Sequence, residues 1–375
     1  MPRGRRWVPS EESDELVFAV CERFLQQLAE QDGDSEDTKK RGAAAVVAQW
    51  AQKEFDREDL TRQRIYPLVW QGVRRKFLFL QPPRKELLAR QLAEHFQVRR
   101  YADDKQVLQV VDVRGPGAAQ HVAAAGADLV LSLIERLGAA RKGPVHIGLG
   151  AGYSAMLVAK RLAHRYSDKS HPKLVLHALS AGGFRVDQPH KAPITYFSYF
   201  DDALTPVDCV ALYAETVVAN RDYERVKQGP GVHKSFERAE QIDIVITSLA
   251  SEEDEHGMLG QFLENLIEEG ELEPDALDRM RRAGWIGDVQ FRPYSSTGPI
   301  TEECPVRAVT LFEISDLVER ARRDDKYVVL LAGTCGECGR TKTKALVPLL
   351  TQPDLRLWTH LITDLQTASE LLAGA

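Results

Sequence analysis

The chain has few cysteines and lacks any long hydrophobic segment. Five cysteines occur among 375 residues, and only Cys335 and Cys338 are close in sequence, so we expect no disulfide framework. No apolar run approaches the roughly 18–20 residues that cross a membrane, and no apolar segment follows the basic N-terminus, as it would in a secretory signal. We therefore expect a cytoplasmic protein with no membrane partner.

The composition is that of a globular protein, but its charge is unevenly distributed. Hydrophobic residues make up 43% and charged residues 28% of the chain, and 375 residues suffice for two domains. The net charge of −6 argues against a surface that binds nucleic acid throughout. Residues 57–100, however, carry eleven Lys or Arg against four Asp or Glu. This excess is typical of a small DNA-binding module, and a solvated helical face is the alternative.

The N-terminal part predicts helices. Apolar residues with helical spacing occur at 16–28 and 46–55, separated by a polar, acidic connection at 31–42. We interpret the third helical pattern, at 61–72, as a recognition helix with basic residues beyond its end. The residues expected to contact DNA are Thr61, Arg62, Gln63, Tyr66, Arg74 and Arg75. Pro67 requires that this helix start later or be kinked, and an internal structural helix is the alternative.

Pro82 and Pro83 interrupt regular structure, and we place a domain boundary there. The preceding segment, 73–80, is expected to be extended. Beyond the prolines, near-continuous apolar strands alternate with helical patterns to the end of the chain. This alternation predicts an α/β domain with a parallel sheet covered by helices on both faces.

A glycine-rich segment at 146–155 follows one predicted strand. Gly148, Gly150 and Gly152 end the strand, and Ser154 opens the next helix. Glycines at the carboxyl end of a strand allow the backbone to approach a phosphate, or merely allow a tight turn. The spacing is not that of a dinucleotide-binding fingerprint, so no nucleotide cofactor is expected.

Two further segments contain candidate ligand-binding residues. After the strand at 327–332, glycines lead to Lys342 near the start of a helix, where a cation and backbone N–H groups favour an anion. Asp288 stands in a glycine-rich, aromatic segment at 284–300. It could accept hydrogen bonds from sugar hydroxyls, hold a catalytic proton, or simply cap a turn.

Cys335 and Cys338 form a lone C-x-x-C. A structural zinc site normally needs a second pair, and the other cysteines do not provide one, so we expect no metal. A redox role remains an alternative to two small residues in a ligand loop.

In this order, these segments resemble the SorC family of bacterial transcriptional regulators, relatives of the DeoR group. The most specific match is LITDLQTASELL (361–372), which resembles the family's Leu-Ile-Thr-Asp-x-x-Thr-Ala-x-x-Leu-Leu. Weaker matches are TRQRIYPLVWQGVRRKFL, Pro82-Pro83 with KELLARQLAEHF, HIGLGAGYSA, IDIVITSLAS, GWIGDV, and Lys342 with Ala345 and Leu346.

The resemblance implies a helix-turn-helix DNA-binding domain at 1–82. It also implies a sugar-phosphate-sensing and oligomerisation domain at 83–375, related to ribose-5-phosphate isomerase and glucosamine-6-phosphate deaminase. The effector site would comprise Gly148, Gly150, Gly152, Tyr153, Ser154, Asp288 and Lys342. In this site the glycine loop would line the phosphate, Asp288 would meet hydroxyls, and Lys342 would neutralise charge.

The expected function is therefore a DNA-binding regulator, not an enzyme, controlled by a phosphorylated sugar. Because helix-turn-helix proteins generally bind paired half-sites, we expect a homodimer or homotetramer. Two alternatives remain open: a sugar-phosphate isomerase or deaminase with Asp288 as base, and a sensor-fold protein that no longer binds DNA.

Overall fold

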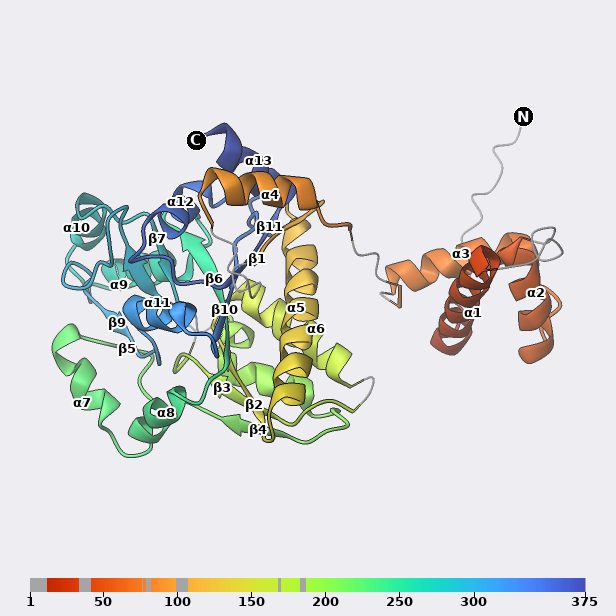
Figure 1. Ribbon diagram of the computed structural model, residues 1–375, viewed down its shortest axis with the longest axis horizontal. Coiled ribbons are helices and arrows are strands. Elements are labelled where there is room, and N and C mark those ends of the chain that lie inside the picture. Colours follow the sequence, from red (N-terminus) through yellow and green to blue (C-terminus); the bar gives the residue numbers. More distant parts are fainter. Residues whose placement is uncertain are drawn as a thin grey trace. The chain divides into compact units, whose positions relative to one another are not determined.

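The chain forms two units in the computed structural model, Met1–Gln81 and Pro82–Ala375 (Figure 1). The structure describes residues 12–33, 42–75, 77–78, 82–98, 107–167, 170–182 and 187–374. Among these residues, no helix has the length and apolar composition needed to cross a membrane.

In its described residues, the first unit forms three helices around a small apolar core. They are α1 (Asp14–Gly33), α2 (Ala43–Glu54) and α3 (Arg62–Arg74). Val17 and Val20 of α1, Val47 of α2, and Ile65 and Leu68 of α3 are buried together. The first helix extends through residues 31–33, which were expected to belong to the polar connection. The rest of the acidic segment, at 34–37, lies outside the described residues.

The third helix differs from the sequence prediction at Pro67 and at its end. It begins at Arg62, directly after Thr61 as the pattern predicts, and continues past Pro67, which excludes the alternative of a later start. Pro67 has no N–H to donate to the Gln63 carbonyl, but packing of Ile65 and Leu68 keeps this stretch helical. The helix also includes residues 73 and 74, which were expected to be extended.

The second unit is built on a parallel sheet. The part of this unit that the structure describes has seven main strands, and each pairs in parallel with its neighbours. In spatial order the strands are β1 (Val107–Val111), β11 (His360–Asp364), β10 (Tyr327–Leu331), β6 (Ile244–Ser251), β2 (Val145–Leu149), β3 (Leu174–Ala178) and β4 (Val207–Val210). The predicted fold class, α/β with a helical N-terminal part, is confirmed.

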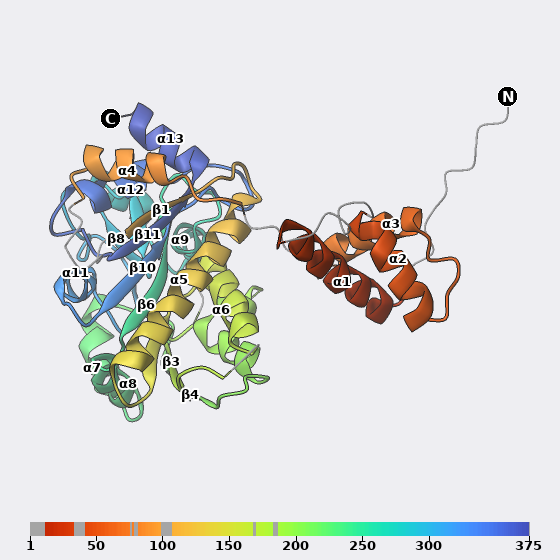
Figure 2. The same ribbon diagram turned by 45° about the vertical axis from the view of Figure 1, so that its right-hand side comes forward.

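Helices cover both faces of this sheet (Figure 2). One face packs against α5 (Ala118–Ala140), α6 (Tyr153–Tyr166) and the 3₁₀ helix η2 (Pro193–Phe200). The other packs against α4 (Glu86–His95), α8 (Val232–Ala239), α11 (Ile314–Arg322), α12 (Thr343–Thr351) and α13 (Leu365–Ala373). Successive strand residues alternate between the two cores: Ile244 and Ile246 face α5 and α6, whereas Val245 faces the opposite layer. Both faces are buried, which explains the near-continuous apolar strands.

Shorter elements border the sheet. A hairpin of β7 (Gly287–Val289) and β8 (Arg292–Tyr294) pairs antiparallel with β6. The segment around Asp288 is therefore strand, not loop. The pair β5 (Val217–Val218) and β9 (Arg307–Ala308) forms a separate two-stranded sheet. The remaining elements are η1 (Pro189–Lys191), η3 (Asn220–Asp222), α7 (Tyr223–Lys227), α9 (Met258–Glu268) and α10 (Ala276–Arg282).

The strand order reverses between β2 and β6. From β2 the chain proceeds to β3 and β4 on one side, and then crosses to β6, β10 and β11 on the other. The connections leaving β2 and β6 therefore diverge to opposite faces of the sheet. In open α/β sheets, the crevice at the carboxyl ends of such a strand pair is the usual place for a ligand.

Candidate functional site

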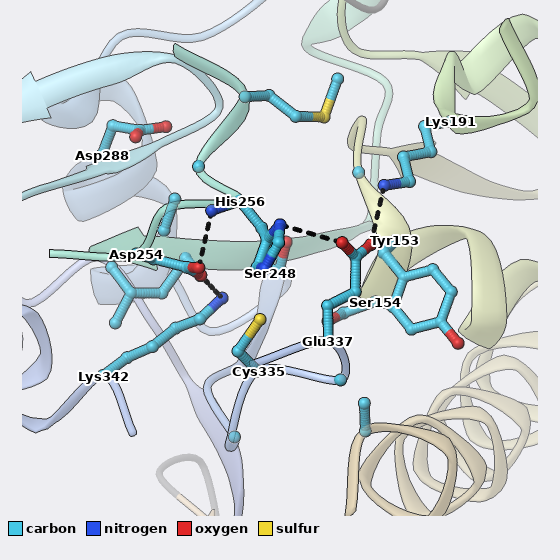
Figure 3. A pocket seen from close by; sticks show the side chains of 18 of the residues that line it. Tyr153, Ser154, Lys191, Ser248, Asp254, His256, Asp288, Cys335, Glu337 and Lys342 are labelled. Carbon is cyan, nitrogen blue, oxygen red and sulfur yellow. Dashed lines mark hydrogen bonds and ion pairs between the residues drawn. The ribbon is translucent and has the colours of Figure 1, made fainter. Parts of the chain in front are cut away.

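A pocket of about 100 Å³ lies at this switch point, where β2, β6 and β10 end (Figure 3). Segments far apart in the sequence line it. They are residues 151–154 after β2, residues within 248–258 at the end of β6, the β7–β8 hairpin at 288–291, residues 333–337 after β10, and two lysines, Lys191 and Lys342. Because a water molecule needs only roughly 10–15 Å³ by a comparable measure, there is room for a small polar ligand.

The structure brings five of the seven predicted effector residues to this pocket. Gly152, Tyr153, Ser154, Asp288 and Lys342 all line it. The family resemblance implied that these residues share one site.

Gly148 and Gly150 do not line the pocket, and close packing accounts for them. A Cβ on Gly150 would lie 2.9 Å from the Ile246 carbonyl oxygen, and one on Gly148 would lie 2.6 Å from the Leu179 side chain. These glycines allow β2 and the turn after it to approach neighbouring chain segments closely. Gly152 has a φ of +109°, a backbone conformation that residues with side chains rarely adopt, and it is the N-cap residue of α6.

Asp288 is a buried carboxyl group on β7. Burial raises its pKa to about 7, although Lys342 and the backbone N–H of Phe291 oppose this rise. At neutral pH the group therefore exists in both protonation states. It can accept a hydrogen bond from a ligand hydroxyl or donate one to a ligand oxygen.

The turn after Asp288 contains two residues with unusual backbone conformations. Gln290 and Phe291 have φ of +52° and +60°, and they join β7 to β8 as a two-residue hairpin connection. Glycine, asparagine and aspartate are the residues usually found in such turns. Both side chains line the pocket, so the strain lies where a ligand would bind.

Two buried polar side chains of the pocket have no hydrogen-bond partner among the residues that the structure describes. They are Gln290, through both its amide oxygen and nitrogen, and Thr334, through its hydroxyl. Gln290 is 7% exposed and Thr334 is 2% exposed, so bulk solvent does not satisfy them. Buried polar groups are normally hydrogen-bonded, so these three atoms are available to a ligand rich in oxygen atoms.

Two lysines lie on different sides of the pocket (Figure 3). Lys342 directly precedes α12, and its Nζ donates to the Leu249 carbonyl oxygen at 2.7 Å and lies 3.6 Å from Asp254 Oδ2. Lys191 lies near the N-terminus of α6, with its Nζ 3.6 Å from Glu337 Oε1 and 5.7 Å from the centre of the Tyr153 ring. Each cation is therefore close to a helix N-terminus, where an anion is favoured.

Acidic residues partly neutralise these cations. Asp254 Oδ1 accepts a hydrogen bond from the backbone N–H of His256 at 3.0 Å, and His256 Nδ1 lies 2.9 Å from Glu337 Oε2. The acids thus link the segment at 251–257 to the loop at 333–339.

The segment 361–372, which carries the most specific sequence match, does not line the pocket but holds one of its loops. Asp364 caps α13 by accepting from the Thr367 backbone N–H at 2.8 Å, and it also accepts from the backbone N–H of Thr334. A Cβ on Gly333 would lie 2.9 Å from Asp364 Oδ2. The Thr-Asp-x-x-Thr pattern therefore holds the loop after β10 in place.

Sequence reasoning missed several pocket residues. Lys191, Asp254, His256, Gln290 and Thr334 all line the pocket. Thr334 directly follows Gly333 in a loop already considered, so it could have been found. Lys191 lies in no recognisable pattern, and only the folded chain brings it to α6.

On the first unit, α3 presents most of the predicted DNA-contacting residues to solvent. Thr61, Arg62, Gln63, Tyr66 and Arg74 are exposed. Trp70, which was not predicted, is 66% exposed on the same helix, four residues after Tyr66. These positions form an outward face, opposite the buried Ile65 and Leu68.

Arg75 differs from the other predicted residues because ion pairing engages it. Its guanidinium lies 2.7 Å from Asp14 Oδ1 and donates to Gln71 Oε1 at 3.1 Å. Arg64, likewise, pairs with Glu12 and Asp59 at 2.5 Å each. These pairs hold α3 against neighbouring segments of its own unit.

The fold is shared with known transcriptional regulators. The full-length sorbitol operon regulator SorC from Klebsiella pneumoniae is similar over 96% of this chain and 100% of its own, with a TM-score of 0.63 and 14% identity. A DeoR family transcriptional regulator from Listeria monocytogenes matches 76% of this chain and 98% of its own, with a TM-score of 0.53 and 15% identity. A transcriptional regulator from Streptococcus pneumoniae covers 76% and 96%, with a TM-score of 0.55 and 15% identity. No protein-family profile and no curated protein sequence matches the chain. The structural neighbours are thus SorC- and DeoR-type regulators, as the sequence resemblance predicts.

Proposed function

We propose that this chain is a transcriptional regulator that binds an operator through α3 and is controlled by a phosphorylated sugar. The observation that carries the proposal is the pocket at the switch point between β2 and β6. It combines two lysines near helix N-termini with unpartnered buried polar groups, a combination suited to a ligand with both a phosphate and hydroxyls.

The neighbours support the same function. The protein from Klebsiella pneumoniae is a sorbitol operon regulator, and the match covers 96% of this chain. A fold alone does not determine function. The pocket chemistry and the exposed basic face of α3 are therefore the independent support.

The phosphate is expected between the N-terminus of α6 and a pocket lysine, with the hydroxyls toward Asp288, Gln290 and Thr334. Gly152, Tyr153 and Ser154 would then contribute backbone and side-chain donors. Because Asp288 has a pKa of about 7, it can serve either as donor or as acceptor for a hydroxyl.

DNA binding is tested with the promoter region of the chain's own gene. A labelled fragment should bind with an affinity that falls steeply as salt rises, and sugar phosphates should change that affinity. Arg62→Ala and Arg74→Ala should weaken binding, whereas Arg221→Ala is the control, because Arg221 is exposed on the second unit. Salt-insensitive binding, or no binding to any genomic fragment, contradicts the DNA-binding part. Sugar-phosphate binding without DNA binding would instead indicate a sensor that acts through protein contacts.

A second candidate function is sugar-phosphate isomerisation or deamination with Asp288 as the base. The observation that favours it is the raised pKa of Asp288, because a general base works best with a pKa near the working pH. Turnover of pentose or hexose phosphates by the purified chain, lost in Asp288→Asn, would establish this function. If the chain binds sugar phosphates tightly but does not turn them over, the result contradicts the enzymatic function and agrees with a regulator.

A further inference from the structure

The Cys335–Cys338 pair does not stand alone in the folded chain. Asp254, from the segment after β6, lies so close that its carboxylate and both sulfurs are all within 4.8 Å of one another. The sequence offered no second cysteine pair, but the structure supplies a carboxylate from a position 81 residues before Cys335.

The loop that carries the cysteines is organised around the first sulfur. Burial raises the pKa of the Cys335 thiol, and the backbone N–H groups of Cys338 and Glu337, which are directed at its sulfur, oppose this rise. The Gly339 N–H donates to the Cys335 carbonyl at 3.1 Å, and the Cys335 N–H donates to the Arg340 carbonyl at 2.8 Å. Gly339 has φ of +75°, a conformation that glycine adopts readily, and it closes this turn. Backbone N–H groups directed at sulfur orient and stabilise thiolate ligands of metals.

The carboxylate is also held in place, with one oxygen toward the sulfurs. Asp254 Oδ1 accepts from the His256 backbone N–H at 3.0 Å and from Cys338 Sγ at 3.9 Å. The other oxygen, Oδ2, lies 3.6 Å from Lys342 Nζ. Asp254 can therefore bind a cation through one oxygen while Lys342 holds the other.

We propose that Cys335, Cys338 and Asp254 bind one zinc ion at the rim of the pocket. Two thiolates and a carboxylate suit Zn²⁺, whereas Mg²⁺ and Ca²⁺ require ligand sets made of oxygen. Zinc–sulfur bonds of about 2.3 Å place tetrahedral sulfur ligands roughly 3.8 Å apart. The three ligand atoms already lie within 4.8 Å of one another, so small side-chain rotations bring them around one ion. Binding releases the two thiol protons to solvent.

Three protein ligands leave the fourth tetrahedral position open. Asp254 and Cys335 both line the pocket, so a water molecule or a ligand oxygen in the pocket can occupy that position. The ion joins the loop at 333–339 to the segment at 251–257. Surface contacts already link these segments, because the Arg340 guanidinium donates to the Glu253 carbonyl oxygen at 2.9 Å and lies 2.7 Å from Glu255. The zinc site stands whether or not the chain binds DNA or a sugar.

The test is metal binding by the full-length, reduced chain without any sugar. Co²⁺ should bind at one equivalent and give an intense thiolate charge-transfer band with the visible spectrum of tetrahedral coordination. Zn²⁺ should displace it. Cys335→Ser and Cys338→Ser should each weaken Zn²⁺ binding by more than roughly 100-fold, and Asp254→Asn by roughly tenfold or more.

Matched controls separate this site from incidental binding. Cys209 is exposed and remote in sequence, so Cys209→Ser should bind Zn²⁺ like the wild type. Bound zinc should protect Cys335 and Cys338, but not Cys209, from alkylation, as measured by mass spectrometry.

Two results would overturn the proposal. One is a reduced chain that takes up no stoichiometric Co²⁺ or Zn²⁺, whether or not oxidation joins Cys335 to Cys338 in a disulfide. The other is an affinity in Cys335→Ser or Cys338→Ser equal to that of Cys209→Ser.

Discussion

At the scale of single residues, either of the two pocket lysines is a candidate to bind the phosphate. Their side chains are only 11% (Lys191) and 15% (Lys342) exposed, so each contributes a charge in a partly desolvated setting. Lys342 already has the Leu249 carbonyl and Asp254 as partners. Lys191 lies at the same distance, 3.6 Å, from a more exposed acid, Glu337, and it lies beside the longer helix, α6.

Lys342→Ala is predicted to weaken sugar-phosphate binding by roughly 1.5–3 kcal/mol, the range for a hydrogen bond to a charged group. Binding of the unphosphorylated sugar should hardly change. Calorimetric titration of wild type and variant with both ligands measures the difference. Lys191→Ala is measured for comparison. If only this variant loses sugar-phosphate affinity, the phosphate binds at the N-terminus of α6. Equal losses for both ligands, or no loss in either variant, contradict a lysine-bound phosphate.

A second residue-scale prediction concerns the strained turn after Asp288. Gln290→Gly relieves a positive φ and removes two unpartnered buried polar atoms, although it makes the unfolded chain more flexible. We expect the free energy of unfolding to rise by about 1 kcal/mol and sugar-phosphate affinity to fall. Urea denaturation and calorimetry measure the two effects.

Gln97→Gly is the matched control for this prediction. Gln97 has φ of +50° but is exposed and away from the pocket, so only backbone strain is relieved there. Sugar-phosphate affinity should not change in this variant. A Gln290→Gly variant that is less stable than the wild type and binds normally would show that the turn is not adapted to a ligand.

At the scale of elements, sequence reasoning succeeded where one element carries its own pattern. The strand and helix at 360–373 follow directly from an apolar run, a capping aspartate and a helical stripe. The alternation of apolar runs and helical patterns likewise predicted most strands of the sheet. The hairpin of β7 and β8 was missed because its strands are only three residues long and its turn uses Gln290 and Phe291 instead of turn-forming residues.

The packing of α1 against α3 depends on Gly72. A Cβ at this position would lie 2.2 Å from Cys21 Sγ, so the two helices approach closely only because position 72 is glycine. Gly72→Ala is predicted to lower the free energy of unfolding of the first unit by roughly 1–3 kcal/mol, the range for overpacking a core. Thermal and urea unfolding of the full chain measure this.

The double variant Gly72→Ala with Cys21→Ala separates this clash from other effects. Removing Cys21 Sγ leaves room for the new methyl group, and alanine in the helix is favoured over glycine by roughly 0.5–1 kcal/mol. The double variant should therefore be more stable than Gly72→Ala alone, with a coupling energy that a double-mutant cycle measures. If the losses in unfolding free energy of the two single variants simply add in the double variant, the methyl group added at position 72 and Cys21 Sγ do not clash specifically.

At the scale of the whole molecule, the full set of pocket residues could not be predicted from the sequence. Its lining combines residues near 152, 191, 254, 290 and 334, and these meet only because β2, β6 and β10 are neighbours in the sheet. The order of parallel strands depends on which helices cover which face, and no local pattern encodes it. Lys191, Asp254 and His256 therefore looked like ordinary surface residues in the sequence.

The parallel sheet also gives the second unit a defined response to acid. His360 of β11 is 2% exposed, with Nδ1 2.9 Å from Thr359 Oγ1 and its ring beside Tyr327. Burial, and secondarily the charge of Arg136, lowers the pKa of His360 to about 4. The unfolded chain has a histidine pKa of about 6.5, so between these values the unfolded state binds more protons than the folded state. His360 therefore contributes stability that is fully present above about pH 6.5 and is lost as pH falls toward 4.

The predicted loss over that range is on the order of 3 kcal/mol. It should appear as a falling free energy of unfolding when urea denaturation is repeated from pH 7 to pH 4. His360→Gln removes the titrating group, so its stability should fall less steeply over this range, even if its stability at pH 7 is lower. His164→Gln, at an exposed position on α6, should keep the wild-type slope. If His360→Gln and His164→Gln show the same pH dependence, His360 is not held neutral by the fold and acid sensitivity arises from other groups.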